Sequence, residues 1–383
     1  MDVLVASLPA YGHLYPMMPL VLALDAAGHR VRVATGAPFL DALPVETVRG
    51  LPAHVDLAWA ERETRERHPE AEEMQAGLAM FGHVVAEAVT EELLRVFEQH
   101  RPELVVFEGT DTGAAIAAHL SGIPALGFGV GQWEPFGAML TPATVKYGED
   151  QWAFRGQEPP ADPFDLLAGL LQPLPPTYRI ADGPDGRPVL PIRSVAFSQS
   201  RDVPTWLFEE RSRPVVYVTL GTVAFGAVET LRSAVEDLAA LDVDVLVAAG
   251  PEGDPEAVGD LPPNVRVERF VAQDRVLGLV DLVVHHGGMG TTLGAFEHGL
   301  PQVVLPQGAD QFLNAGRLAE VGAGRPIEQD GVVPGAVGAA VEELLAPDAP
   351  ERAAARTLQA EVAAMPAPAD VVADLEALVA AGG

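Results

Sequence analysis

Short apolar runs alternate along the chain with longer stretches in which apolar residues recur every three or four positions. In the first half the runs that predict strands are residues 3–6, 30–35, 104–107 and 125–128. The helical spacing covers residues 14–27, about 76–100, and the stretch from about 112. Buried strands that alternate with helices predict a parallel sheet covered on both faces, so this half is expected to be an α/β doubly wound domain.

The same alternation begins again in the second half. Residues 173–214 are rich in Pro, Gly and Asp and sustain neither period, which predicts a linker with a boundary near 200–214. The later runs that predict strands are residues 215–219, 243–247, 265–268, 282–285 and 303–305. We therefore expect domains over 1–200 and 201–365, and a C-terminal helix over 366–383 that packs back on the N-terminal domain.

The length and charge of the chain narrow the possible functions. A chain of 383 residues is longer than one hydrophobic core usually supports, and 48% hydrophobic residues suffice for two cores. The net charge of −30 argues against a nucleic-acid partner, which needs clustered Lys and Arg. Because Lys146 is the only lysine, an anionic ligand must be held by backbone dipoles, neutral donors, a few arginines or a metal.

Two absences in the sequence limit the chemistry and the location. The chain has no cysteine, so disulfides, thiolate metal sites and a cysteine nucleophile are excluded. No uncharged apolar run reaches about 18 residues, the length needed to span a bilayer. The N-terminal apolar segment has no basic flank before Arg30. We expect a cytoplasmic protein without membrane insertion.

A glycine-rich turn follows the apolar run 280–284 and opens a helical pattern. It reads His285-His286-Gly287-Gly288-Met289-Gly290-Thr291-Thr292. The first turn of a helix leaves backbone N–H groups unpaired, and glycines let an anion approach the backbone closely. The alternative is that the glycines only permit a tight turn. Two histidines and two threonines at the same turn favour an anion site, with His285 expected to pack or to cap the strand.

Three motifs carry a resemblance to a known family. They are Gly12-His13-x-x-Pro16 after the first strand, His286-Gly287-Gly288-x-Gly290-Thr291, and Asp310-Gln311-x-x-Asn314-Ala315. The chain resembles family 1 glycosyltransferases along its whole length, and most closely the bacterial members that move deoxysugars from dTDP donors onto natural products such as macrolides and enediynes. The resemblance implies the GT-B fold, in which two Rossmann-like domains face each other across a cleft. It also implies an inverting transfer without a metal or other cofactor.

His13 is the candidate general base. It follows the first predicted strand, and an unperturbed histidine with a pKa near about 6.5 can take a proton from a hydroxyl at neutral pH. The alternative is a helix residue without chemistry. Glu108 stands at a strand end and can orient the imidazole, although family members usually have aspartate there. Asp111 competes with Glu108 for this role, or serves as a helix N-cap.

The resemblance also assigns a donor site in the second domain. His286, Gly290 and Thr291, with Gly287 and Gly288, would contact the diphosphate and stabilise it as it leaves. The residues expected to hold the nucleoside are Phe270 by stacking, Val271 through its backbone, and Gln273 at the ribose. Those expected to hold the sugar are Asp310, Gln311, Gly221 and Thr222.

Position 294 bears on the choice of nucleotide. UDP-using relatives often have a glutamate eight residues after the counterpart of His286, where it grips the ribose hydroxyls. This chain has Gly294 there. Because thymidine diphosphate lacks the 2′-hydroxyl, the missing carboxylate favours a dTDP donor over a UDP donor.

Acceptor specificity is expected from loops of the first domain over residues 54–82 and 132–172. Aromatic and methionine side chains there suit an apolar aglycone, although some of them must belong to the core. The candidates are Trp59, Met80, Phe81, Trp133, Phe136 and Met139. The expected ligands are thus a nucleotide sugar and an apolar acceptor such as a polyketide, with the protein a monomer or a homodimer.

Other functions fit the sequence less well. The first strand-to-helix turn, residues 8–13, lacks the G-x-G-x-x-G of a dehydrogenase, and the chain contains no P-loop. A nucleotide-sugar 2-epimerase of GT-B fold is the nearest enzymatic alternative. A non-catalytic auxiliary protein that activates a partner transferase is the other, and the presence of His13 argues against it.

Overall fold

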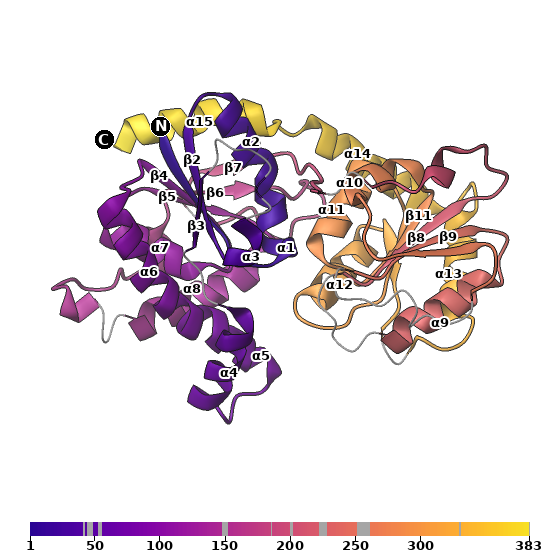
Figure 1. The fold of residues 1–383 in the computed structure, drawn as a ribbon, viewed down its shortest axis with the longest axis horizontal. Helices are drawn as coiled ribbons and strands as arrows, with labels where there is room; N and C mark the ends of the chain where they lie inside the picture. The colour runs from indigo at the N-terminus through magenta and orange to yellow at the C-terminus, as the bar shows by residue number, and fades with distance from the viewer. Residues whose placement is uncertain are drawn as a thin grey trace. The chain divides into compact units, whose positions relative to one another are not determined.

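The protein forms two compact α/β units, shown as a computed structural model in Figure 1. The structure describes residues 1–40, 43, 49–52, 56–147, 152–184, 186–199, 202–221, 228–250, 261–328 and 331–382. The first unit contains residues 1–174, 179–193 and 365–383, and the second contains residues 175–178 and 194–364. None of the described helices is both long and apolar enough to cross a membrane.

The first unit is built on a seven-stranded parallel sheet with the order β3-β2-β1-β4-β5-β6-β7. Its strands are β1 Asp2–Ala6, β2 Arg30–Thr35, β3 Arg49–Pro52, β4 Leu104–Glu108, β5 Ala125–Phe128, β6 Gly169–Gln172 and β7 Val189–Pro191. β1 pairs with β2 on one side and with β4 on the other, so that Val3 lies between Val31 and Leu104. The order of strands reverses between β1 and β4, and ligands of doubly wound sheets bind beyond the carboxyl ends of such a pair.

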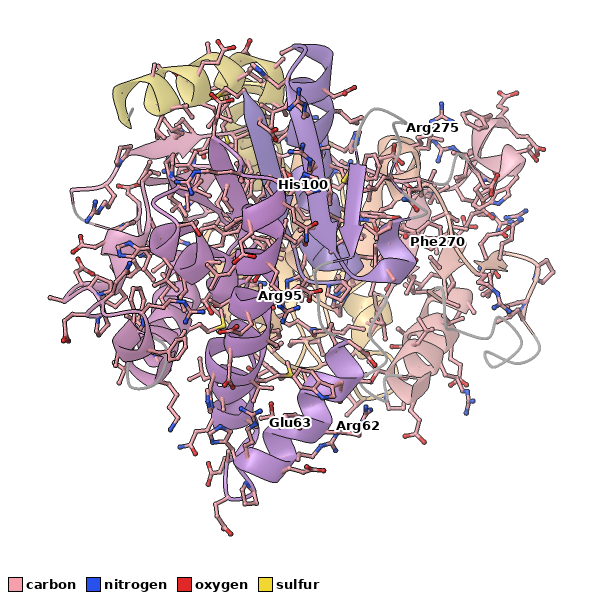
Figure 2. The ribbon with its side chains drawn as sticks, turned by 60° about the vertical axis from the view of Figure 1, so that its left-hand side comes forward. Arg62, Glu63, Arg95, His100, Phe270 and Arg275 are labelled. Carbon is pink, nitrogen blue, oxygen red and sulfur yellow. The ribbon has the colours of Figure 1, made fainter. Side chains whose placement is uncertain are left out.

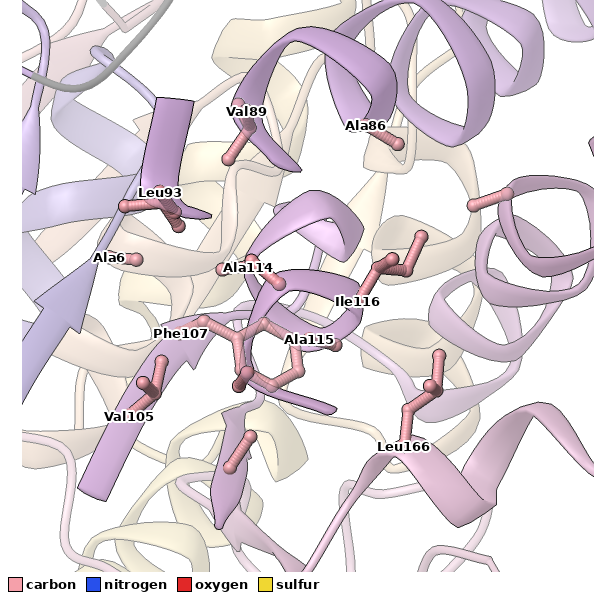
Figure 3. Close-up of a cluster of buried hydrophobic side chains, with 14 of the residues drawn as sticks. Ala6, Ala86, Val89, Leu93, Val105, Phe107, Ala114, Ala115, Ile116 and Leu166 are labelled. Atoms are coloured by element: carbon pink, nitrogen blue, oxygen red, sulfur yellow. The ribbon is translucent and has the colours of Figure 1, made fainter. Parts of the chain in front are cut away.

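Helices cover both faces of this sheet. α6 Ala86–Gln99 and α7 Thr112–Leu120 pack on one face, where Figure 3 shows Val105 and Phe107 of β4 against Ala114 and Ile116. On the other side of the strands, α15 Pro368–Gly382 lies alongside α2 Met18–Ala26. Further described helices are α1 Tyr11–Leu14, α3 Ala37–Leu40, α4 Leu57–Arg67, α5 Glu73–Ala79, a π-helical turn Met80–Val85, and α8 Trp133–Tyr147, with 3₁₀-helices at Tyr15–Met17 and Pro163–Leu166.

The second unit repeats the arrangement with six parallel strands in the order β10-β9-β8-β11-β12-β13. They are β8 Val215–Thr219, β9 Asp244–Ala248, β10 Val265–Glu268, β11 Leu282–His285, β12 Gln302–Val304 and β13 Gly324–Pro326. Its helices are α9 Val228–Ala239, α10 Gln273–Val276, α11 Met289–Glu297, α12 Gln311–Glu320, α13 Ala336–Leu345 and α14 Pro350–Ala364. β8 and β11 are the pair at which the order reverses, and His285 pairs with Thr219 there.

Each face of the second sheet has its own core. Val216, Val218 and Val284 pack with Leu238 of α9 and Val341 of α13 on one face. On the other face, the buried set is Val215, Tyr217, Leu246, Val283, Val276, Leu277 and Ala295. Because strand residues alternate between the two faces, a strand that is buried throughout is apolar at nearly every position.

The sequence missed the short strands. β3, β7 and β13 are each three or four residues long and lie at sheet edges, and β6 is four residues long. β7 lies within residues 173–214, the predicted linker, so part of this segment belongs to the first sheet. A strand of three residues has too few positions to display a period, and it is held in place by its neighbour.

The two segments expected to be loops are largely helical. Residues 54–82 contain α4, α5 and the start of the π-helical turn, and residues 132–172 contain α8. In α4, Asp56 caps the first turn by accepting a hydrogen bond from the Ala58 N–H. Ion pairs four residues apart, Glu61 with Arg65 and Glu63 with Arg67, line its outer side. The charged run therefore forms an exposed helix, on which Figure 2 shows Arg62 and Glu63.

Candidate functional site

Each unit has one candidate site. It lies at the carboxyl ends of the two neighbouring strands between which the strand order reverses, β1 and β4 in the first unit and β8 and β11 in the second. In the first unit, α1 follows β1 and carries His13, while Glu108 is the last residue of β4. β1 and β4 pair with Ala6 opposite Phe107, so their ends lie side by side. This register brings together two side chains that are 95 positions apart in the sequence.

His13 and Glu108 form a close pair. His13 Nδ1 lies 3.1 Å from Glu108 Oε2, and the glutamate side chain is fully buried while that of His13 is 25% exposed. Burial acts to raise the pKa of the Glu108 carboxyl. The nearby His13 and hydrogen bonds from His13 and Thr110 outweigh burial, so this pKa lies below its ordinary value and the carboxylate is ionised at neutral pH.

Asp111, the other candidate partner of His13, lies three residues after Glu108, where α7 begins. It is buried at the N-cap of α7, where its side chain makes no capping hydrogen bond. Thr110, which the sequence reasoning missed, has its hydroxyl 3.1 Å from His13 Nδ1 and 2.5 Å from Glu108 Oε1. The only sequence signal for Thr110 is a hydroxyl residue two positions after a strand end.

The residues expected at the acceptor site come from several helices of the first unit. The Phe81 ring, in the π-helical turn, lies 6.4 Å from the His13 ring between centroids. Half-buried side chains that pack on the same core are Trp59, Met80, Phe81 and Trp133. Met139 is buried, and the side chain of Phe136 lies outside the described residues. Phe81 thus has a ring contact with His13.

In the second unit, His285 closes the end of β11, as its expected capping role predicted. The Gly287 N–H donates to His285 Nδ1 at 3.1 Å, so the ring hydrogen is on Nε2, which lies 2.8 Å from Gln302 Oε1. Burial, helped by neighbouring His286, lowers the pKa of His285 to about 3. His285 is therefore a neutral structural group.

His286 is held between glycines. A Cβ at Gly221 would lie 2.6 Å from its Cε1 atom, and a Cβ at Gly288 would lie 2.4 Å from its Nε2 atom. Gly221 also has a φ of +84°, a conformation that favours glycine. Burial lowers the pKa of His286 to about 4, against a smaller opposite effect of a hydrogen bond with the Thr219 backbone. His286 is thus a neutral imidazole in a close-fitting slot.

A hydrogen bond connects the glycine turn, residues 285–292, to α12. Gly287 has a φ of +93°, and a Cβ there would lie 2.9 Å from Val304 Cγ1. Asn314 donates through Nδ2 to the Gly287 carbonyl at 3.0 Å and to Asp310 Oδ2 at 2.9 Å. The buried Asn314 amide therefore joins the expected phosphate turn to the carboxylate expected to read the sugar.

Two glutamines of the expected donor site already form hydrogen bonds within the protein. Gln311 Oε1 accepts from the backbone N–H groups of Gln307 and Gly308, at 2.8 and 3.3 Å. Gln273 Oε1 accepts from the hydroxyls of Tyr217 and Thr291, at 3.4 and 3.5 Å. These contacts fix both amides with their carbonyl ends turned toward the protein. Thr222 lies outside the described residues.

The segment expected to hold the nucleoside connects β10 to α10. Phe270 is half-buried there (Figure 2), whereas Val271 is only 3% exposed and belongs to the core. At the start of α11, Gly290 has open space where a Cβ would be. Further along α11, a Cβ at Gly294 would lie 2.6 Å from Leu277 Cδ1. Leu277 thus occupies the space beside Gly294.

Comparison of the chain with known proteins identifies its fold class and the family to which it belongs. The two parallel doubly wound units match solved GT-B glycosyltransferases over nearly the whole chain. Residues 22–221 match the N-terminal domain described as Erythromycin biosynthesis protein CIII-like, and residues 232–378 match the C-terminal domain of the same description. The chain belongs to this family of glycosyltransferases, and the predicted GT-B fold and family are confirmed.

Individual relatives cover nearly the whole chain. The L-demethylnoviosyl transferase of Streptomyces niveus is 34% identical over 98% of this chain and 98% of its own length. The glycosyltransferase VinC in complex with dTDP is 28% identical, with a TM-score of 0.78 and full coverage of both chains. The spinosyn rhamnosyltransferase SpnG complexed with spinosyn aglycone is 28% identical, with a TM-score of 0.82 over 98% of this chain and 100% of the other.

Proposed function

We propose that the protein transfers a deoxysugar from a dTDP-sugar to a hydroxyl group of an apolar natural-product aglycone, with inversion at the anomeric carbon. The observation that carries the proposal is the contact of 3.1 Å between His13 Nδ1 and the buried carboxylate of Glu108. An imidazole oriented in this way serves as a general base. Relatives named for sugar transfer and the dTDP complex of VinC support the same reaction class.

In this reaction His13 activates the acceptor. With Nδ1–H directed at Glu108, the lone pair of the neutral ring is on Nε2, which takes the proton of the acceptor hydroxyl. The hydroxyl oxygen bonds to the anomeric carbon as the bond to the diphosphate oxygen breaks, through an oxocarbenium-like transition state. Glu108 stabilises the imidazolium that forms. The products are the glycoside, dTDP and a proton.

The second unit stabilises the leaving group in this proposal. Negative charge builds on the diphosphate as the sugar departs, and the unpaired N–H groups at the start of α11 are suited to receive it. Thr291 and His286 would add side-chain donors, for which the Thr291 hydroxyl would turn from Gln273 Oε1 and the His286 ring N–H from the Thr219 backbone. These groups meet the charge of the diphosphate without a metal ion.

The same unit would select the nucleotide and the sugar. Phe270 offers a ring for base stacking, Val271 its backbone, and Gln273 the NH₂ end of its amide for the ribose. Asp310 and Gln311 would read the sugar hydroxyls beside Gly221 and Thr222.

The close approach of Leu277 to Gly294 supports a dTDP donor. A carboxylate side chain at position 294 would first have to displace Leu277.

The acceptor would bind in the first unit beside Phe81, whose ring already contacts that of His13. The other candidates for contacts to an apolar aglycone are Trp59, Met80, Trp133, Phe136 and Met139.

Incubation with a panel of dTDP-sugars and apolar aglycones, read by mass spectrometry, tests the function. A product heavier than the aglycone by one deoxysugar is expected only when both substrates are present. Release of free nucleotide without any acceptor would instead identify a 2-epimerase.

Calorimetric titration tests the choice of nucleotide. We expect dTDP to bind more tightly than UDP, and tighter binding of UDP would contradict a dTDP donor.

A further inference from the structure

Thr110 contacts both members of the His13 and Glu108 pair. Its hydroxyl lies 2.5 Å from Glu108 Oε1 and 3.1 Å from His13 Nδ1. Its backbone N–H donates to Glu108 Oε2 at 3.0 Å. Both oxygens of the buried carboxylate are therefore held by one residue, which lies two positions after it in the chain.

The positions of the hydrogens follow from these distances. An ionised carboxylate can only accept hydrogen bonds, so the single hydroxyl hydrogen of Thr110 points at Glu108 Oε1. The lone pairs of that hydroxyl oxygen are then turned toward His13 Nδ1. Because Glu108 Oε2 and the Thr110 hydroxyl oxygen both accept at Nδ1, the ring hydrogen belongs on Nδ1 and the lone pair on Nε2.

We infer that Thr110 is a positioning residue that keeps Glu108 ionised and His13 in the tautomer able to act as a base. The inference rests on the proposed function, because it explains how the proposed base is prepared. Without the hydroxyl, Oε1 of a fully buried carboxylate loses its side-chain donor. A buried carboxylate with fewer donors takes up a proton more readily.

That proton would reverse the hydrogen bond. A neutral Glu108 can donate its O–H to His13 Nδ1, which places the ring hydrogen on Nε2 and removes the lone pair that accepts the proton of the substrate.

The local chain geometry explains why glutamate functions at position 108. The Asp111 N–H donates to the Glu108 carbonyl at 2.9 Å, which closes a turn just after β4. This turn brings the backbone and side chain of Thr110 back toward the carboxylate. The extra methylene of glutamate, compared with aspartate, gives the carboxylate the length to meet Thr110 and His13 together.

Replacement of Thr110 by valine and by serine tests the inference. Thr110→Val keeps the shape and removes the hydroxyl, so we expect kcat to fall roughly 10-fold, the size of one lost hydrogen bond to a charged group. Thr110→Ser keeps the hydroxyl and should restore most of the rate. In proteins labelled with ¹⁵N-histidine, two-bond nitrogen–proton correlation spectra should show His13 with Nε2 unprotonated in the wild type and protonated to a larger extent in Thr110→Val.

Thr90→Val is the matched control. Thr90 is a buried threonine of the first unit whose hydroxyl contacts the carbonyls of Ala86 and Gly113, at 2.7 and 3.1 Å. Its replacement removes a buried hydroxyl of the same kind, so stability should fall while kcat and the His13 tautomer stay as in the wild type.

The outcomes separate this inference from the proposed function. A wild-type rate and tautomer in Thr110→Val would overturn the role of Thr110, even if His13→Ala is inactive. Full activity of His13→Ala would overturn the proposed base itself.

Discussion

The two units place histidines at equivalent positions, beyond the carboxyl ends of the strands where the order of each sheet reverses, yet the surroundings differ. His13 lies 3.1 Å from a buried carboxylate and is partly exposed. His286 is confined by Gly221 and Gly288, and burial lowers its pKa to about 4. A neighbouring carboxylate stabilises the protonated form of an imidazole, whereas burial without one stabilises the neutral form.

This difference assigns the two histidines opposite parts in the proposed reaction. A ring beside a carboxylate is suited to receive a proton, and a ring kept neutral is suited to donate a hydrogen bond without titrating. If the two histidines have these separate roles, a substitution in one unit should leave the function of the other unit largely unchanged. Changes near Glu108 should lower the rate, and changes near the glycine turn should lower donor affinity.

The largest effect is expected from His13→Ala. Loss of a positioned general base lowers kcat by about 10²- to 10⁴-fold. Turnover with the best dTDP-sugar and acceptor pair measures this effect, and thermal unfolding checks that the variant is folded. Wild-type turnover would remove His13 from the reaction.

Gly288→Ala should damage the second unit. Its new Cβ would lie 2.4 Å from His286 Nε2, so the ring must move. Overpacking of this kind typically costs about 1–3 kcal/mol of stability. We expect the variant to bind dTDP roughly 10-fold more weakly, as measured by calorimetry, while kcat at saturating donor changes much less. An unchanged affinity would show that the position of His286 does not matter for the diphosphate.

His285→Asn should change how stability depends on pH. The pKa of His285 is about 3 in the folded protein, against 6.5 as its ordinary value. Between these values the unfolded chain holds a proton that the folded chain lacks, so stability falls as pH falls, by about 1.4 kcal/mol per pH unit for this group.

Asparagine at position 285 can still accept from the Gly287 N–H but does not titrate. Urea unfolding from pH 6.5 down to 4.5 should therefore show a slope shallower by about one proton. Equal slopes in the two proteins would mean that His285 is protonated in the folded state.

Gly290→Ala should have the smallest effect on stability, and it is the control for the overpacking expected in Gly288→Ala. A Cβ at Gly290 meets nothing within 4 Å, so the fold should tolerate it. Alanine is favoured over glycine in a helix by up to about 1 kcal/mol, so the free energy of unfolding should stay the same or rise slightly. A clear loss of stability would show that the open space at this position is occupied.

The fold was predictable wherever burial leaves a long apolar run. Residues 215–219, 265–268 and 282–285 were predicted as strands with the bounds that β8, β10 and β11 have in the structure. β13, with the sequence Gly-Arg-Pro, shows no apolar pattern and is defined by its pairing with β12. Such a strand depends on tertiary contacts, which no local pattern reveals.

Of the candidate site, only the residues at or just after strand ends could be predicted from the sequence. His13 and Glu108 follow or end predicted strands, so their proximity follows from a parallel sheet. The contacts of Thr110 and Asn314 depend on the path of a turn and on the rotation of an amide, both set by packing. For the same reason the sequence did not show that Gln311 uses its carbonyl oxygen to close its own loop.

Calorimetric titration of dTDP into the His13→Ala variant tests most directly whether the two units act separately. If His13 serves only the acceptor, the dissociation constant should stay within about twofold of the wild-type value, because the substitution removes no group that binds dTDP. A weakening of dTDP binding by the same large factor as the loss of turnover would contradict this division.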